Sequence, residues 1–126
     1  MTDFSPLQGL CVVSLEQAVA APLCTRRLVL AGAEVIKVER PEGDFARGYD
    51  TAVHGASSYF AWANAGKQSV VLDLKGEEGL GQLKSLIAHA DVLVQNLKPG
   101  ALGKLGIDLE ELHSCRPEFI LSLIHI

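Results

Sequence analysis

Short apolar runs recur along the chain, separated by stretches in which the apolar side chains are spaced differently. Runs of four or five mostly β-branched or leucine residues, bounded by polar or glycine residues, are typical of buried strands. The pattern therefore predicts strands at residues 10–14, 34–38, 69–73, 91–95 and 119–122.

Between these runs the apolar residues follow a helical spacing. The first predicted helix has Pro22 in its first turn and ends before Gly32, which are the helix positions that proline and glycine prefer. A second helix is predicted over residues 77–89, where leucine and isoleucine side chains form one stripe. Short helical turns are predicted after Gly100 and after Asp108, a suitable N-cap residue.

Strands that alternate with helices through short connections predict an α/β fold: a Rossmann-like parallel sheet with helices on both faces. In such sheets ligands lie outside the carboxyl ends of the strands. This rule selects segments 15–21, 39–48, 73–76 and 96–100 as candidate binding segments. Residues 39–57 form a long loop, and loops of that length inside a domain are usually functional.

The sheet predicted from this sequence is incomplete. Its fifth strand runs into Ser-Leu-Ile-His-Ile, an apolar end with no covering helix, whereas domains normally end in polar segments. We therefore expect residues 1–126 to be the N-terminal part of a longer protein, and we interpret residues 122–126 as a non-native tail.

Composition narrows the functional classes. Lys and Arg number 11 against 15 Asp and Glu, a net charge of −4 that disfavours a nucleic-acid partner. No apolar run is long enough to cross a membrane, and the N-terminus does not resemble a secretory signal. Cys11, Cys24 and Cys115 have no metal-ligand spacing and are expected to be reduced core thiols of a cytoplasmic protein.

The first two strand ends favour a phosphorylated ligand. The first lacks the glycine fingerprint of a dinucleotide site, but its small residues before Pro22 allow close approach to a helix N-terminus. At the second, Glu39 is suited to a ribose hydroxyl, whereas Arg40 suits a ribose that carries a phosphate. A phosphorylated adenosine nucleotide other than plain NAD fits best. The alternative is that the small residues are packing residues and that Lys37, Glu39 and Arg40 form a solvated face.

The next strand end also carries cations. Lys67 and Lys75 bracket the third strand, and Asp73 lies near its carboxyl end. Any one of these lysines is typical of an ordinary exposed charge. Their recurrence at strand ends favours a role in anion binding.

The fourth strand end offers both an amide and cations. Asn96 and the backbone around Leu97 are suited to hydrogen bonds with a base or an amide, and Lys98 and Lys104 are suited to phosphate. The histidines form no recognisable catalytic pattern, and no metal site is predicted. The aromatic segment 59–62 could stack on a base, but such clusters more often belong to a core.

Together these segments resemble the class III CoA-transferase family, also called the CaiB/BaiF family. The resemblance covers residues 6–121 in one order. It rests on Pro6-Leu-Gln-Gly-Leu-Cys-Val-Val13, Ala21-Pro-Leu-Cys-Thr-Arg26, Gly32-Ala-Glu-Val-Ile-Lys-Val-Glu-Arg-Pro41, Gly43-Asp-Phe-Ala-Arg47, Gly66-Lys-Gln-Ser-Val-Val-Leu-Asp-Leu-Lys75 and Ala90-Asp-Val-Leu-Val-Gln-Asn-Leu-Lys-Pro-Gly100.

The resemblance implies a cytoplasmic enzyme that moves CoA between an acyl-CoA thioester and a carboxylic acid. It implies an interlocked homodimer with no prosthetic group. The family's catalytic aspartate lies beyond residue 126, so no catalytic residue is expected here. The CoA-contacting positions that the resemblance implies are Val19, Ala20, Arg40, Leu72, Asp73, Leu74, Lys75, Asn96, Leu97, Lys98 and Lys104.

Other functions stay open at this point. Some members of the family racemise 2-methylacyl-CoA thioesters, and the chain could equally be a non-catalytic CoA- or nucleotide-binding module. An NADP-dependent oxidoreductase is disfavoured by the missing glycine fingerprint. After Leu121 the family continues with Ser-x-x-Gly-Tyr-Gly, from which residues 122–126 depart.

Overall fold

The computed structural model describes residues 5–123 and contains one parallel sheet in which the predicted strands all take part. The strands are β1 (Cys11–Leu15), β2 (Glu34–Glu39), β3 (Gln68–Val71), β4 (Val92–Gln95) and β5 (Ile120–Leu123). They are ordered β3-β2-β1-β4-β5 across the sheet. The predicted α/β class with a parallel sheet is confirmed.

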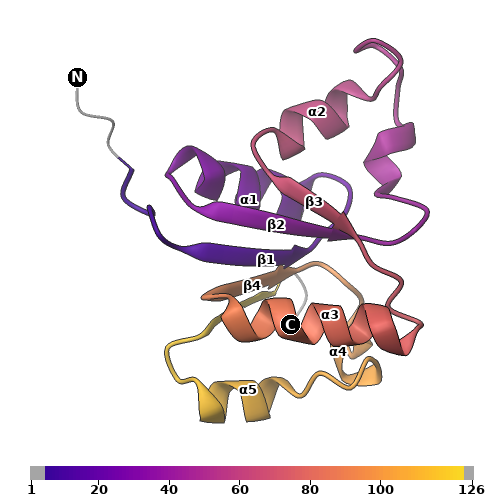
Figure 1. The fold of residues 1–126 in the computed structure, drawn as a ribbon. Coiled ribbons are helices and arrows are strands. Elements are labelled where there is room, and N and C mark those ends of the chain that lie inside the picture. The colour runs from indigo at the N-terminus through magenta and orange to yellow at the C-terminus, as the bar shows by residue number, and fades with distance from the viewer. Residues whose placement is uncertain (1–4, 124–126) are drawn as a thin grey trace.

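Helices cover both faces of the sheet, as predicted. They are α1 (Ala20–Leu30), the 3-10 turn η1 (Phe45–Gly48), α2 (Ser58–Asn64), α3 (Glu77–His89), α4 (Ala101–Lys104) and α5 (Leu109–Cys115). Figure 1 shows α1 and α2 on one side of the sheet, with α3, α4 and α5 on the other. No helix within residues 5–123 has the length and apolar character needed to cross a membrane.

The apolar core lies on both faces because successive strand residues point to opposite sides. On β1, Val12 packs with Ala21 and Val35 under α1, while Val13 packs with Leu83 against α3. Both faces of the central strands are therefore buried, which explains their nearly continuous apolar character.

Arg116 joins the far end of α3 to the segment that leads into β5. Its guanidinium donates hydrogen bonds to the carbonyl oxygens of Ile87 at 3.0 Å, Ala88 at 3.1 Å and Ala90 at 2.5 Å. It also lies 4.9 Å from the centre of the Phe119 ring. The last carbonyls of a helix lack partners within the helix, so this cation satisfies groups that would otherwise need water.

Several expectations about individual elements were wrong. Helix α2 was not predicted, although Ser57 caps it by accepting a hydrogen bond from the Phe60 amide at 3.3 Å. Tyr59 and Trp62 are 51% and 53% exposed, so they do not belong to a core.

Two of the three cysteines also differ from expectation. All three are free thiols, but Cys24 and Cys115 are exposed and Cys11 is only half-buried, so the prediction of core thiols is wrong for the first two. Cys24 lies on α1, and Cys115 is the last residue of α5. Of the predicted non-native tail, Ser122 and Leu123 belong to β5, and residues 124–126 lie outside the described residues.

Candidate functional site

The site predicted from the sequence lies where the order of the strands reverses. The chain leaves β1 toward α1 on one face, and leaves the neighbouring β4 toward α4 on the other. In α/β sheets the crevice between two such exits is the usual ligand site. Here the two exits are joined: the Asn96 side chain accepts from the Gln17 amide at 3.1 Å and donates to the Gln17 carbonyl at 2.8 Å.

A hollow of about 90 Å³ opens at these strand ends. Ligand pockets usually measure about 300–1,000 Å³, so this hollow is one wall of a site rather than a complete enclosure. Residues from the ends of β1 and β2 and from the segments after β3 and β4 line it: Leu15, Glu16, Gln17, Val38, Glu39, Arg40, Gly43, Asp44, Leu74 and Leu97.

The predicted positions Val19 and Ala20 lie at the start of α1. Val19 is the N-cap residue and has no side-chain cap hydrogen bond, so the side chains leave the first amides of the helix open to an acceptor. The N-terminus of an 11-residue helix carries partial positive charge, which suits a phosphate or a carbonyl oxygen. Neither residue lines the hollow itself.

Arg40 follows β2 directly and borders the hollow. Its Nε donates to the Gly43 carbonyl at 2.9 Å, and its guanidinium carbon lies 4.0 Å from the centre of the Phe45 ring. The side chain is exposed and forms no ion pair among the described residues. The remaining guanidinium N–H groups are thus held near the site and are available to an anion.

The predicted segment 72–75 contributes mainly backbone groups to the structure at the end of β3. Leu72 is buried in the core, and its amide donates to the Glu39 carbonyl at 3.0 Å. Asp73 accepts from the Lys75 amide at 3.1 Å, which turns the chain after β3. Leu74 lines the hollow, and Lys75 is exposed.

Gly79 lets α3 approach this turn closely. A Cβ atom at Gly79 would lie 2.1 Å from the Asp73 carbonyl oxygen, a distance that no side chain tolerates. The glycine within the predicted helix is therefore required for packing of α3 against the segment 72–75.

The last predicted positions follow β4. Leu97 lines the hollow, and its amide donates to the Gln95 side chain at 2.7 Å. Lys98 and Lys104 are exposed and do not line it. Of the predicted residues, the structure thus brings Arg40, Leu74 and Leu97 together around the hollow, and the other eight do not line it.

A buried charged cluster next to the hollow was missed by the sequence analysis. The Lys37 ammonium lies 2.6 Å from the Asp44 carboxylate, 2.9 Å from Asn64 Oδ1 and 3.8 Å from the Glu16 carboxylate. Lys37 is fully buried on β2, so the interpretation of Lys37 and Glu39 as a solvated face is wrong. A lysine on a central strand covered on both faces has no path to solvent and must find partners inside.

Lys67 extends this cluster to the other side of Glu16. Its ammonium lies 2.6 Å from Glu16 Oε1 and 2.8 Å from the Pro22 carbonyl oxygen, while Thr25 donates to Glu16 Oε2 at 2.6 Å. The Lys67 side chain is 1% exposed, so it is not an ordinary surface charge. Burial lowers the pKa of Lys67, while the Glu16 carboxylate opposes that shift. We define residues Glu16, Lys37, Asp44, Asn64 and Lys67 as the buried ionic cluster.

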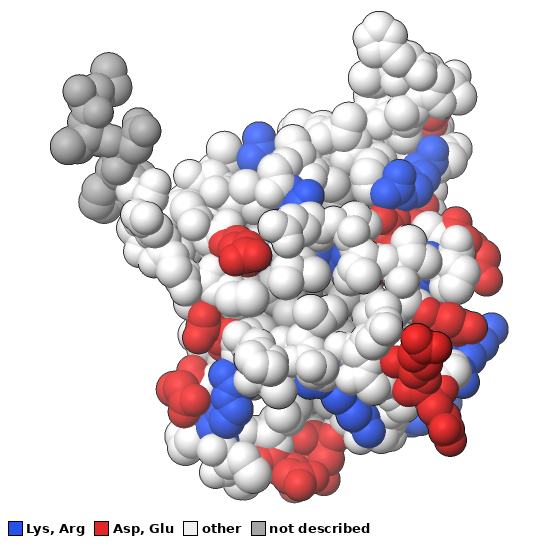
Figure 2. All heavy atoms as spheres, in the orientation of Figure 1, with Lys and Arg blue, Asp and Glu red and all other residues white. Residues whose placement is uncertain are grey.

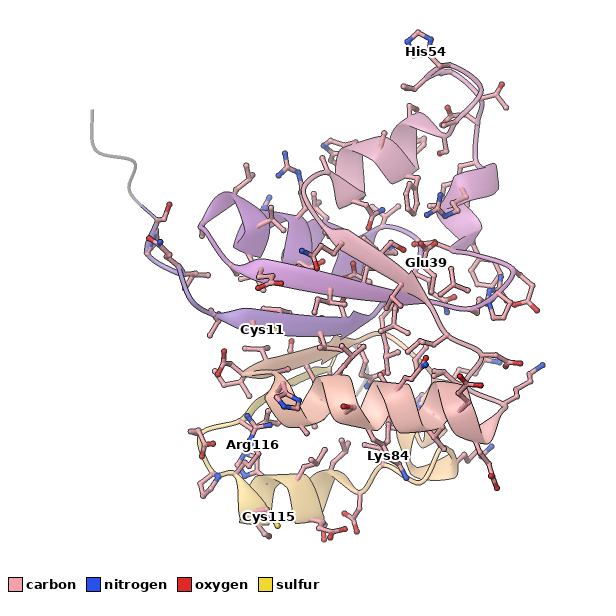
Figure 3. The ribbon with its side chains drawn as sticks, in the orientation of Figure 1. Cys11, Glu39, His54, Lys84, Cys115 and Arg116 are labelled. Atoms are coloured by element: carbon pink, nitrogen blue, oxygen red, sulfur yellow. The ribbon has the colours of Figure 1, made fainter. Side chains whose placement is uncertain are left out.

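Glu39 is not an open acceptor for a ribose. Arg47 donates to both of its oxygens, at 2.8 and 2.7 Å, and Ser69 and the Asp44 amide donate to them as well. Figure 3 shows Glu39 at the end of β2, facing the segment that carries Arg47. The hydrogen bond from Arg47, with those from Ser69 and Asp44, lowers the pKa of Glu39 to about 2.

Acid is therefore expected to remove part of the stability. The pKa of Glu39 in the folded chain lies below the value of about 4.3 for an unfolded chain, so the unfolded state is protonated first as the pH falls. The contribution is fully present above about pH 5 and is lost as the pH falls toward about 2. We expect it to amount to about 1–2 kcal/mol, because Arg47 is half exposed and its charge is screened.

Urea denaturation of the wild type and of Glu39→Gln between pH 7 and pH 2.5 measures this contribution. The difference in free energy of unfolding between the two proteins should shrink as the pH falls. Hydrogen bonds from Ser58 and Ala52 also lower the pKa of Asp50 to about 2. Asp50 is present in both proteins, so its contribution cancels in the difference. A difference that stays constant across this range would contradict the assignment.

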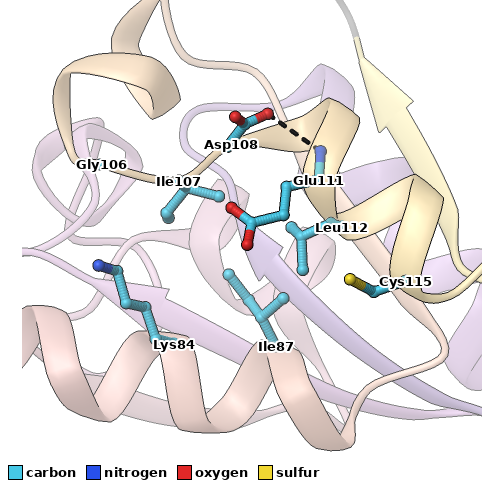
Figure 4. A pocket seen from close by; sticks show the side chains of 8 residues that line it. All are labelled: Lys84, Ile87, Gly106, Ile107, Asp108, Glu111, Leu112 and Cys115. Atoms are coloured by element: carbon cyan, nitrogen blue, oxygen red, sulfur yellow. Dashed lines mark hydrogen bonds between the residues drawn. The ribbon is translucent and has the colours of Figure 1, made fainter.

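A second hollow of about 300 Å³ lies between α3 and α5. It is lined by Lys84, Ile87, Gly106, Ile107, Asp108, Glu111, Leu112 and Cys115, none of which was predicted as a site residue. Figure 4 shows the Glu111 carboxylate facing the hollow, and its charge opposes an anionic ligand.

Within residues 5–123 no group of three His, Cys, Asp or Glu side chains is arranged to bind a metal. Figure 2 shows acidic and basic side chains interspersed on the face drawn.

The parallel sheet, covered by helices on both faces and open at its strand ends, defines an α/β protein, and comparison with known proteins identifies the family. Residues 7–125 match CoA-transferase family III, and the chain belongs to this family. The resemblance seen in the sequence is confirmed.

Individual relatives agree with this assignment. The chain is 39% identical to the acetyl-CoA:oxalate CoA-transferase of Acetobacter aceti, over 93% of this chain and 30% of the relative. It is 37% identical to the succinate–glutarate CoA-transferase of Agrobacterium fabrum, over 98% of this chain and 34% of the relative. A crystal structure of a CaiB/BaiF family protein from Brucella suis superposes with a TM-score of 0.86 at 39% identity, over 96% of this chain and 33% of that one. The chain spans about a third of the length of these relatives.

Proposed function

We propose that this chain is the N-terminal, CoA-binding part of an enzyme that transfers CoA between an acyl-CoA thioester and a carboxylic acid. The observation that carries the proposal is the crevice at the reversal of strand order, where Arg40 and the uncapped start of α1 offer donors to phosphate. The family relatives support it, since their names describe transfer of CoA to oxalate or between succinate and glutarate.

The charges around the crevice suit the phosphates of CoA. Arg40 would contact the phosphorylated ribose, and the amides at Val19 and Ala20 would meet a phosphate or carbonyl oxygen. The exposed cations Lys75, Lys98 and Lys104 would supply further favourable charge around the strand ends. The backbone of residues 72–74 and 96–97 would border the nucleotide.

The transfer step itself would need a nucleophilic carboxylate that attacks the thioester carbonyl, so that a mixed anhydride forms and the C–S bond breaks to release the CoA thiolate. This carboxylate is freed again once the thiolate has been passed to the acceptor acid. The buried carboxylates of Glu16, Glu39 and Asp44 are each held by an ammonium or guanidinium group. A carboxylate held in this way is a poor nucleophile. We therefore assign the reacting carboxylate to the rest of a longer, cytoplasmic protein, which we expect to be an interlocked homodimer.

Exchange of isotopically labelled CoA between an acyl-CoA and a free acid tests this proposal. With acetyl-CoA or succinyl-CoA as donor and oxalate or glutarate as acceptor, the longer protein should catalyse exchange and the 126-residue chain alone should not. Exchange by the short chain would overturn the division of roles. A longer protein that binds CoA but catalyses no exchange, and instead exchanges the α-proton of 2-methylacyl-CoA, would indicate a racemase.

A further inference from the structure

Ala18 adopts an unusual backbone conformation at the entrance to the proposed CoA site. Its φ angle is +67°, in the left-handed region that residues with a Cβ atom seldom occupy. Ala18 lies between Gln17, which Asn96 holds, and Val19, the N-cap residue of α1. This conformation therefore sets the direction in which the open amides of α1 point.

Asp44 holds Ala18 in this conformation. Asp44 Oδ1 accepts hydrogen bonds from the Ala18 amide at 2.8 Å and from the Ala46 amide at 2.9 Å. Its other oxygen accepts from the Lys37 ammonium at 2.6 Å. Asp44 is only 5% exposed, and its own amide is fixed by Glu39 at 3.0 Å.

We propose that Asp44 is a positioning residue for CoA binding, which acts by holding Ala18 left-handed so that the start of α1 faces the nucleotide. The inference rests on the proposed function, because it names CoA as the ligand. The proposal gives the buried ionic cluster a role in positioning the ligand site, which packing alone does not require. Lys37 orients the Asp44 carboxylate. The carboxylate in turn orients the backbone at Ala18, which lies far from Asp44 in the sequence.

An Asp44→Asn substitution tests this role without changing the size of the side chain. Both carboxylate oxygens are acceptors here, whereas an amide has only one oxygen. The asparagine can therefore serve either Lys37 or the two backbone amides, but not both. We expect the Kd for CoA, measured by isothermal titration calorimetry on the longer protein, to rise about tenfold, which corresponds to ~1.4 kcal/mol.

A second substitution separates positioning from general damage. Glycine enters the left-handed region without a steric penalty, so Ala18→Gly in the Asp44→Asn background should return the Kd to within about threefold of the wild type. Unchanged CoA affinity in a folded Asp44→Asn protein would overturn the inference, and so would a complete lack of rescue by glycine. Asp108→Asn, which alters an N-cap carboxylate on α5, is the matched control and should leave the Kd unchanged.

Two further measurements cover the remaining outcomes. If Asp44→Asn does not fold, Ala18→Val should bind CoA at least about tenfold more weakly than Ala18→Gly, because β-branched residues are strongly disfavoured at positive φ. Equal affinities would overturn the inference.

Amide hydrogen exchange at Ala18 can be measured without a ligand. The protection of the Ala18 amide from exchange should fall in Asp44→Asn. A wild-type protein that shows this protection but binds no CoA would overturn the proposed function, whereas CoA binding with unaltered exchange in Asp44→Asn would overturn the inference alone.

Discussion

Lys37→Met is expected to lower the free energy of unfolding by about 3–5 kcal/mol, the usual effect of removing one partner from a buried ion pair. The substitution leaves the Asp44 carboxylate inside the protein without its ammonium at 2.6 Å. Asn64 loses a donor at 2.9 Å as well. Methionine fills a similar volume, so the loss would report the uncompensated charge rather than a cavity.

Urea denaturation of the 126-residue chain at pH 7, followed by circular dichroism, gives the free energy of unfolding. Lys84→Met is the matched control, because Lys84 is exposed on α3, and it should change that free energy by at most about 0.5 kcal/mol. A second test combines Lys37→Met with Asp44→Asn. The two losses should fall short of additivity by at least about 1 kcal/mol, since the double variant no longer holds an unpaired charge. Additive losses, or a Lys37→Met protein as stable as the control, would contradict the description of the cluster.

Arg40→Ala is expected to weaken CoA binding by about 1.5–3 kcal/mol, the range for hydrogen bonds that involve a charged group. The side chain is held at Nε by the Gly43 carbonyl and rests on the Phe45 ring, so its remaining donors need little ordering on binding. Because the proposed contact is to the phosphate on the ribose, the loss should be smaller for dephospho-CoA. Arg40 is not paired with Glu39, which binds Arg47 instead, so a change at Arg40 leaves that ion pair intact.

The apolar pattern predicted the fold well because each signal was local. Helix α3 begins and ends at the predicted residues, since its stripe of leucines is long and its flanking residues are clear. Strand β3 begins one residue before and ends two residues before the prediction, because Asp73 accepts the Lys75 amide and turns the chain. Helix α2 is only seven residues long, which is too few helical turns for the spacing of its apolar residues to be recognised.

The candidate site was predictable only in outline. The rule that ligands lie at strand ends located Arg40, Leu74 and Leu97. It could not distinguish Lys37 from a surface lysine, because the partners of Lys37 lie 7 and 27 residues away in sequence. The contact between Asn96 and Gln17 spans 79 residues and depends on the neighbouring positions of β1 and β4. Such pairings follow from the strand order and are invisible in any local window.

Binding of CoA at the crevice beside Arg40 can be measured in a single calorimetric comparison. Wild-type and Arg40→Ala forms of the longer protein are titrated with CoA and with dephospho-CoA. We expect the wild type to bind CoA, and Arg40→Ala to lose about tenfold or more in CoA affinity but much less in affinity for dephospho-CoA. Equal losses for the two ligands, or no binding of CoA by the wild type, would contradict this expectation.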